Sequence, residues 1–222
     1  MTETERHSKA LEPELISDPD EKAQVEALNG LRQYDQVYDL VRQWTLPEHP
    51  RFKLRISVIL GLQRTALEGL SSYAGNFRPA SVEIEESNHT PPGAHLVPEL
   101  VEQMCDYVND NWEEKTAVHL AAYVMWRLNW IHPFADGNGR TSRALSYMVL
   151  CIRSGNLLPG DNTIPDQITN NKQPYYDALE KADEAWKSGV VDLSAMEELL
   201  SARLATQLAD YYRAATGQSP SS

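Results

Sequence analysis

The sequence has little cysteine, no long apolar run and a shortage of positive charge, and each of these shortages excludes a class of protein. Its two cysteines, Cys105 and Cys151, cannot build a disulfide framework and lie within apolar helical patterns, so we expect free, buried thiols in a reducing compartment. No apolar run approaches the roughly 18 residues of a membrane span, and the polar residues 1–15 lack the apolar core of a signal peptide. A soluble, cytoplasmic protein is expected.

Basic residues are scarce as well: 20 Lys and Arg stand against 32 Asp and Glu, and the formal net charge is −12. This sign opposes nonspecific binding to nucleic acid or to an anionic membrane, so neither is expected as a partner. It does not exclude a small anion held by a few local cations. The 11 Gly and 13 Pro among 222 residues are too few for a low-complexity chain, and 41% hydrophobic residues suffice for a core.

Apolar residues recur at helical spacing along most of the chain, which predicts an all-α fold. Asp18 and Pro19 are typical of a helix start, and Ser194 with Glu197 forms a capping-box pattern at another. Helices are predicted over residues 19–44, 53–70, from 98 onward, 115–130, 139–154, 174–187 and 194–212, with flexible or irregular chain at 1–16 and 155–172. The chain divides into an N-terminal leader and helical arm (1–50), a main domain (51–205), and a helix end with a flexible tail (206–222).

One short segment has a different period. Val82 and Ile84 alternate with polar neighbours over residues 81–85, and this period of two predicts a short strand or hairpin. It is the only strong strand signal in the sequence.

The segment between the two most apolar helices has the composition of a ligand-binding loop. It reads IHPFADGNGRTSR over residues 131–143, and Pro133 with the glycines disfavours a continuous helix through it. Gly137 and Gly139 let backbone N–H groups approach a ligand closely, at a point where the next helix begins and presents its positive end. A loop fixed between two buried helices is a suitable place for a site.

The charged residues of this loop indicate which ligand it takes. Arg140 and Arg143 share a face of the first helical turn, where two cations are unfavourable unless a multiply charged anion such as phosphate binds them. Asp136 beside such a site suits a Mg²⁺ held by one carboxylate and substrate phosphates. His132 can accept a proton near neutral pH. Taken singly, each feature has a simpler interpretation: a core histidine, a glycine turn, and solvated or salt-bridged arginines.

The whole string resembles the signature of the Fic family, His-x-Phe-x-(Asp/Glu)-Gly-Asn-Gly-Arg-x-x-Arg, and matches it at every fixed position from His132 to Arg143. The resemblance covers residues 52–204. Residues 75–78 and the strand after them are similar to the family's flap, and residues 170–179, with Tyr175 and Tyr176, are similar to its nucleotide-pocket helix. The expected fold is a Fic-type helical domain over residues 51–205, with a short β-hairpin flap over the active site.

The resemblance implies a protein adenylyltransferase, which transfers AMP from ATP to a Ser, Thr or Tyr hydroxyl of a target protein and releases diphosphate. By the same resemblance, His132 would be the general base, Asp136 would hold Mg²⁺, and Phe134 would anchor the loop. Asn138 and the neighbouring amides would bind the α-phosphate, and Arg140 and Arg143 the β- and γ-phosphates. The predicted nucleotide-binding residues are Gly137, Asn138, Gly139, Arg140, Arg143, Tyr175 and Tyr176.

The flap would supply the surface on which the target protein docks. Val82, Glu83 and Ile84 would offer an exposed strand edge that pairs with an extended target segment. The acidic residues at 83, 85 and 86 would favour basic segments. A solvated hairpin face is the alternative interpretation.

Two other functions stay open. In the Doc branch of the same superfamily, whose members resemble kinases, a Lys stands where this chain has Gly139, so Gly139 favours adenylyl transfer over phosphorylation. The other is a non-catalytic nucleotide-binding interaction module, although pure binding needs neither His132 nor Asp136.

Regulation is also open. The family's inhibitory motif, (Ser/Thr)-x-x-x-Glu-(Gly/Asn), has no clean copy here, and residues 25–30 have its outline with Val25 and Asn29 at the informative places. An inhibitory partner protein, a degenerate arm and no inhibition are the three options.

Overall fold

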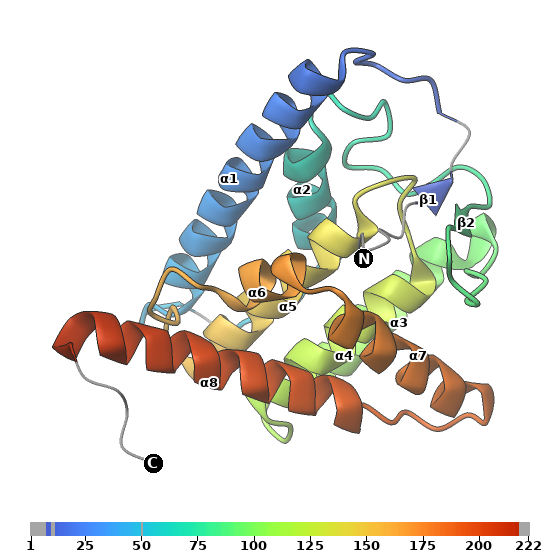
Figure 1. Ribbon diagram of the computed structural model, residues 1–222. Helices are drawn as coiled ribbons and strands as arrows, with labels where there is room; N and C mark the ends of the chain where they lie inside the picture. Colours follow the sequence, from blue (N-terminus) through green and yellow to red (C-terminus); the bar gives the residue numbers. More distant parts are fainter. Residues whose placement is uncertain (1–7, 10–11, 50, 218–222) are drawn as a thin grey trace.

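The computed structural model describes residues 8–9, 12–49 and 51–217, and these form a bundle of helices (Figure 1). The prediction of an all-α fold is confirmed. The elements in chain order are β1 (Ser8–Lys9), α1 (Pro19–Trp44), α2 (Ile56–Leu67), β2 (Glu83–Ile84), the 3₁₀ helix η1 (Ala94–Leu96), α3 (Val97–Asp110), α4 (Ala117–Ile131), α5 (Asn138–Ser154), α6 (Ile164–Asn170), α7 (Gln173–Lys187) and α8 (Ser194–Thr216).

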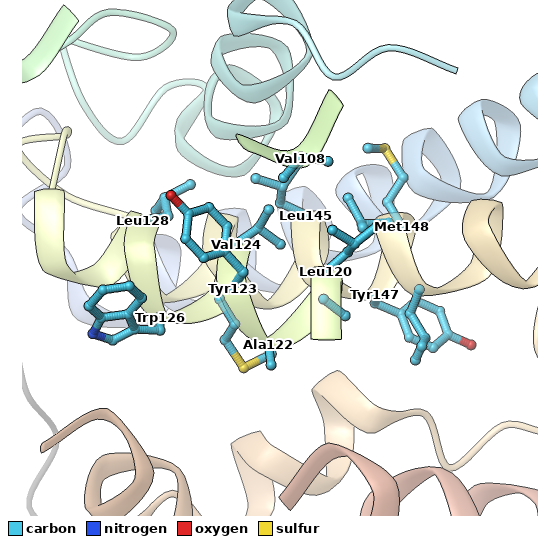
Figure 2. Packing of buried hydrophobic residues seen from close by; sticks show 14 of the residues in the cluster. Val108, Leu120, Ala122, Tyr123, Val124, Trp126, Leu128, Leu145, Tyr147 and Met148 are labelled. Carbon is cyan, nitrogen blue, oxygen red and sulfur yellow. The ribbon is translucent and has the colours of Figure 1, made fainter. Parts of the chain in front are cut away.

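The two most apolar helices, α4 and α5, form the centre of the bundle. They pack against each other, while α1 and α2 contact α5, and α3, α7 and α8 contact α4. Figure 2 shows the contact region, where fully buried side chains of α3, α4 and α5 meet: Val108, Leu120, Val124, Leu128, Leu145 and Met148. Burial of each such side chain contributes roughly 1.5–3 kcal/mol. The loop that joins α4 to α5 is therefore held between two strongly anchored helix ends.

The first helix begins where the sequence predicts. The Asp18 carboxylate accepts hydrogen bonds from the N–H groups of Asp20 and Glu21, both at 2.9 Å, and thereby satisfies two donors that a helix start leaves without partners. Further along α1, the buried side chains of Asn29 and Gln33 donate to the carbonyls of Glu68 (2.8 Å) and Leu62 (2.9 Å). These bonds fix α1 against α2.

The strand prediction is correct in place, but the prediction of a hairpin is wrong. β2 pairs antiparallel with β1, so that Ser8 lies opposite Ile84 and Lys9 opposite Glu83. The signal for β1 is missing from the sequence because a two-residue strand has no period to detect. A strand this short is formed by its partner rather than by its own propensity.

The expectation of a flexible leader is wrong for the part that the structure describes. The Glu12 carboxylate accepts from the Ser71 hydroxyl (2.8 Å), the Ser72 hydroxyl (2.9 Å) and the Ser72 N–H (2.5 Å). Glu12 is thus tied to the turn after α2. Residues 1–7 and 10–11 of the predicted leader lie outside the described residues.

Several helix ends differ from the predictions. The helix expected over 53–70 is α2, which is shorter at both ends, and the stretch 155–172 contains α6. The capping box is wrong: the N-cap of α8 is Leu193, whose apolar side chain makes no cap bond, and the Glu197 carboxylate lies 2.6 Å from His119 Nδ1. α8 also continues past 212 to Thr216. The division at residues 50 and 205 stays a prediction.

The two thiols are free and buried, as predicted. Burial raises the pKa of Cys105 to about 12 and that of Cys151 to about 11, so neither is a reactive thiolate near neutral pH. Among the described residues, no helix combines the length and the apolar composition that crossing a membrane requires.

Candidate functional site

The site begins at the carboxyl end of α4, where His132 interrupts the helix. Its N–H still donates to the Leu128 carbonyl at 2.8 Å, but its backbone is left-handed, with φ 52° and ψ 58°. Pro133 explains part of this, since the residue before a proline is disfavoured in the right-handed helical region. A left-handed non-glycine residue is uncommon and must be held by its surroundings. The result is a histidine fixed at the corner between helix and loop.

The loop after His132 is held rigidly from inside. The Asn138 amide donates to the Phe134 carbonyl and accepts from the Phe134 N–H, each at 2.9 Å. Phe134 is fully buried, with its ring centroid 6.0 Å from that of Phe77, which agrees with the expected anchor. Gly137 has φ 80° and closes the loop, and a Cβ there would overlap the Leu67 side chain. Glycine is therefore required at 137 by both conformation and space.

A cleft of about 1140 Å³ lies beside this loop, between α1, the β2 segment, the start of α5, α6 and α7. It brings together most of the residues that the sequence predicts for the site: Ile84, His132, Asp136, Gly137, Asn138, Gly139, Arg140, Arg143, Tyr175 and Tyr176. Val82 and Glu83 are not part of its lining: Val82 is buried, and Glu83 is exposed elsewhere on the surface.

The imidazole of His132 is neutral at physiological pH. Burial lowers its pKa to about 4, and the nearby His89 and Arg78 act in the same direction, while Asp136 and the Asn129 carbonyl oppose it. The Asn129 carbonyl lies 3.3 Å from Nδ1, so Nδ1 carries the proton and Nε2 is the basic atom of the ring. The ring is thus set up to accept a proton at Nε2.

Arg140 is engaged by carboxylates on two sides. Its Nη2 lies 2.9 Å from Asp136 Oδ2 and its Nη1 3.7 Å from Glu26 Oε1 of α1. The Asp136 Oδ1 also accepts from the Gly137 N–H at 2.5 Å. An anion that binds Arg140 would have to displace at least one of these two carboxylates from the guanidinium.

The start of α5 contributes further donors. Its N-cap is Gly137, which has no side chain to cap it, and the N–H groups of a first helical turn have no intrahelical acceptors. Arg143, one turn along, is half-buried, and its Nη1 lies 3.2 Å from the position that a Cβ at Gly139 would take. The positive end of α5 and the two arginines therefore face one region of the cleft.

The two tyrosines have different positions in the cleft wall. Tyr175 is 2% exposed, and its hydroxyl lies 3.3 Å from the Ser142 hydroxyl of α5; burial raises its pKa. Tyr176 is half-buried and more accessible. Tyr175 therefore joins α7 to α5, and Tyr176 is the better placed of the two to contact a ligand.

The donor set suits a metal ion that is held largely by its substrate. Among the described residues, no group of three or more His, Cys, Asp or Glu side chains is arranged to hold a metal. Asp136 supplies one carboxylate, half-exposed, at the cleft. Mg²⁺ commonly binds through one or two carboxylates plus phosphates and water, so Asp136 fits the expected role.

Sequence reasoning missed five residues of the site. Arg78, His89, Asn129 and Asp183 surround His132 or its helix end, and Glu26 lies across the cleft beside Arg140. All five are far from the loop in the sequence or lie inside ordinary helical patterns. The residues at 75–78 were noted for their resemblance to the flap, but nothing in their spacing indicates what the Arg78 side chain binds.

Comparison with known proteins gives the family. Residues 53–150 match the model of the Fic/DOC family. The chain contains a Fic domain. It is 34% identical over 136 residues to protein adenylyltransferase Fic of Drosophila willistoni, a match covering 60% of this chain and 26% of that protein. It is 25% identical over 173 residues to a probable protein adenylyltransferase of Aquifex aeolicus, covering 77% and 49%. The chain thus spans between a quarter and a half of these relatives.

Solved structures agree on the fold. Fic-1 from C. elegans, as its E274G variant, superposes with a TM-score of 0.69 at 23% identity, covering 91% of this chain and 55% of that one. A Fic domain containing signaling protein from Bacteroides thetaiotaomicron gives a TM-score of 0.65 at 22% identity, covering 87% and 74%. The Fic fold therefore extends beyond the residues that the family model matches.

The segment with the outline of the inhibitory motif lies in α1, beside the Fic cleft. Its Asn29, at the glutamate position of the motif, is 1% exposed and donates to the Glu68 carbonyl at 2.8 Å. This amide therefore binds α2. The α1 carboxylate that lies beside a signature arginine is Glu26, next to Arg140.

Proposed function

We propose that this Fic domain is a protein adenylyltransferase, which transfers AMP from ATP to a Ser, Thr or Tyr hydroxyl of a target protein and releases diphosphate. One observation carries the proposal: a buried, neutral histidine whose basic atom is Nε2 shares a cleft with two arginines and the amino-terminal end of α5. This combination provides a base and an anion site together. The names of the relatives, protein adenylyltransferase Fic and probable protein adenylyltransferase, support the same activity.

In the proposed reaction, the cleft positions the triphosphate and His132 removes a proton. The target hydroxyl oxygen attacks the α-phosphorus, its proton passes to His132 Nε2, and the bond from the α-phosphorus to the bridging oxygen of diphosphate breaks. A bound triphosphate places negative charge beside the imidazole and raises its pKa from about 4 toward neutrality, which makes it a more effective base. Transfer of this kind depends mainly on positioning and charge neutralisation.

The nucleotide contacts follow from the same geometry. The amides at the start of α5 would hold the α-phosphate, Arg140 and Arg143 the β- and γ-phosphates, and Tyr176 the nucleoside. The Asn138 side chain is occupied with Phe134, so its contribution is to hold the loop in shape. Mg²⁺ bound by Asp136 would neutralise phosphate charge.

The structure limits how a target can dock on the flap. One edge of β2 is already paired with β1 of the same chain, so this edge is not exposed as the sequence suggested. We propose that a target segment either displaces residues 8–9 or approaches from the cleft side, where Ile84 lies. A basic target segment paired along this strand could place a positive side chain opposite Glu83, which is exposed.

The Doc-type phosphotransferase is the second candidate, and Gly139 argues against it. A side chain at 139 would meet Arg143 Nη1 at 3.2 Å from its Cβ, so a lysine there would change the anion site. Gly139 leaves the Arg143 guanidinium in its present position, where it can bind a phosphate.

The decisive experiment uses Mg²⁺ and ATP labelled either at the α-phosphate or at the γ-phosphate, with a cell lysate as the source of targets. We expect transfer of the α-label alone, abolished by His132→Ala with ATP binding retained. His95→Ala, an exposed histidine outside the cleft, is the matched control and should transfer normally. Transfer of the γ-label would indicate a phosphotransferase, and bound ATP without any transfer would indicate a binding module. Near wild-type transfer by His132→Ala would contradict the assignment of the base.

A further inference from the structure

Arg78 is a buried cation that the proposed reaction does not use. It lies between α2 and β2 and is 3% exposed. Its guanidinium donates to three backbone carbonyls: those of His132 through Nε (2.8 Å), Ala80 through Nη1 (2.9 Å) and Pro92 through Nη2. Its own N–H donates to the Pro133 carbonyl at 2.9 Å. Every one of these bonds goes to the backbone.

The positions of these carbonyls give the side chain a specific role. Ala80 and Pro92 are the two ends of the segment that contains β2, which we call the flap (residues 80–92). One guanidinium therefore closes the base of the flap and binds the carbonyl of the histidine. Since each N–H direction of the guanidinium is fixed by its planar fork, the three carbonyls cannot move independently.

His132 needs such support. Its left-handed backbone is held on the amino side by the bond from its N–H to Leu128. On the carbonyl side it is held by Arg78 Nε, and the adjoining Pro133 carbonyl is held by the Arg78 N–H. Residues kept in sparsely populated conformations persist only where their surroundings over-determine them.

A second contact ties the far part of the flap to the same helix end. His89 Nε2 lies 2.7 Å from the Trp130 carbonyl, which requires the proton on Nε2. His89 Nδ1 lies 3.8 Å from Asp183 Oδ2 of α7, and Asp183 Oδ1 accepts from Trp126 Nε1 at 2.8 Å. His89 of the flap and Arg78 at its base thus bind carbonyls two residues apart, at 130 and 132.

We propose that Arg78 is a positioning residue for His132, with His89 as a second tie, so that the flap and the catalytic histidine are held as one unit. A change in the flap, such as a segment docking on it, would then reach the histidine directly. The inference rests on the proposed function only where it calls His132 the base. The alternative is that Arg78 merely fastens the flap.

Charge as well as geometry distinguishes the two roles. Besides burial, four groups shift the pKa of the His132 ring: the Asn129 carbonyl and Asp136 raise it, and His89 and Arg78 lower it. Fastening a loop does not require a cation beside the histidine. Replacing Arg78 with Lys keeps the charge and loses the fork, whereas replacing it with Met loses both.

The test compares Arg78→Lys, Arg78→Met, His89→Gln and His89→Ala in the full chain, with Arg55→Met as a control. Arg55 is an exposed arginine outside the cleft. Three quantities are measured on folded protein: the His132 titration by NMR of ¹⁵N-labelled histidine, hydrogen exchange of residues 80–92, and kcat and KM for ATP with the acceptor found in the labelling experiment.

We expect Arg78→Met to lower kcat roughly 10–100-fold, the effect of misplacing a reacting group by about 1 Å, while KM for ATP changes little. Flap exchange should increase and the His132 titration should move to higher pH. Arg78→Lys should restore the titration but only part of kcat. His89→Gln, which can still donate to Trp130, should behave nearly as wild type, and His89→Ala should loosen the flap and lower kcat.

A folded Arg78→Met variant with wild-type kcat and an unchanged His132 titration would overturn the inference. If that variant does not fold, Arg78→Lys and the His89 pair decide: wild-type flap exchange and kcat in both Arg78→Lys and His89→Ala would overturn it equally. If wild-type protein transfers no label at all, the proposed function fails, and the titration and exchange measurements still decide whether Arg78 and His89 hold the histidine.

Discussion

At the scale of single residues, the chemistry of the site comes from burial rather than from unusual residues. His132 is 6% exposed, and loss of hydration is the first cause of its low pKa. The same burial explains why its ring is neutral and why its tautomer is set by one backbone carbonyl. The sequence could identify this histidine from its motif. It could not identify Arg78 or His89, because a contact across more than 40 residues leaves no local pattern.

The depressed pKa of His132 predicts a specific dependence of stability on pH. The folded pKa is about 4 against about 6.5 in an unfolded chain, so between these values the unfolded state binds the proton more strongly. The free energy of unfolding is therefore unaffected by His132 above pH 6.5 and decreases as the pH falls toward 4, because His132 then takes up a proton in the unfolded chain. At pH 5 this proton uptake lowers the free energy of unfolding of the wild type by about 2 kcal/mol relative to pH 7.5.

His132→Asn removes the titrating group and should remove that part of the pH dependence. The measurement is the free energy of unfolding in urea at pH 7.5 and pH 5 for both proteins. Carboxylates contribute equally to both, so the difference isolates the histidine. Equal losses of stability in wild type and variant would mean that the ring is not desolvated in the folded protein.

At the scale of elements, α1 is the wall of the cleft that the sequence treated as an arm. Its length and start were predictable, because Asp18 and Pro19 mark the helix N-terminus and its apolar residues keep a helical period. Its partner was not predictable. The polar residues Asn29 and Gln33 are buried against α2 and donate to carbonyls of that helix and its C-cap. In the sequence, a buried amide cannot be told from an exposed one. The result places the Glu26 carboxylate beside Arg140.

Glu26 should weaken nucleotide binding because it competes with phosphate for Arg140. Partly exposed ion pairs are worth about 0.2–1 kcal/mol, so Glu26→Gln is expected to raise the affinity for Mg-ATP by roughly 1.5- to 5-fold. Isothermal titration calorimetry measures this directly. Asp39→Asn, an exposed carboxylate on the same helix outside the cleft, controls for net charge. An unchanged affinity in Glu26→Gln, or an equal gain in Asp39→Asn, would show that the pair with Arg140 does not limit binding.

At the scale of the whole molecule, local sequence patterns predict the helices of the bundle but not the contacts between distant segments that hold its ends together. The helices of the core were predictable because their apolar faces are long and periodic. The pairing of β1 with β2 and the seven-residue α6 were not, since each depends on contacts between distant segments. The loop from His132 to Arg143 was predictable because its function requires a fixed local string. The residues that position that loop were not predictable, because they lie on several other elements and follow no fixed spacing from the loop.

The C-terminal end of α8 (Figure 1) gives the clearest test of where the domain ends. The expected boundary at 205 leaves Gln207 outside the Fic domain, yet Gln207 is fully buried. Its Oε1 accepts from the Ile164 N–H at 3.1 Å, and its Nε2 donates to the Tyr147 hydroxyl and the Pro159 carbonyl, both at 3.0 Å. These bonds join α8 to α5, to α6 and to the segment between them.

Truncation after residue 205 should therefore destabilise the chain, as should the single change Gln207→Leu. Each buried polar group left without a partner costs about 1–3 kcal/mol, and water can reach some of these groups, so we expect a loss of roughly 2–4 kcal/mol for Gln207→Leu. Urea denaturation measures it, with Gln43→Leu at an exposed position of α1 as the control. The truncated chain should lose at least as much as the single variant. A truncated chain with wild-type stability would place the end of the domain at residue 205, because the bonds of Gln207 would then contribute nothing to holding the bundle together.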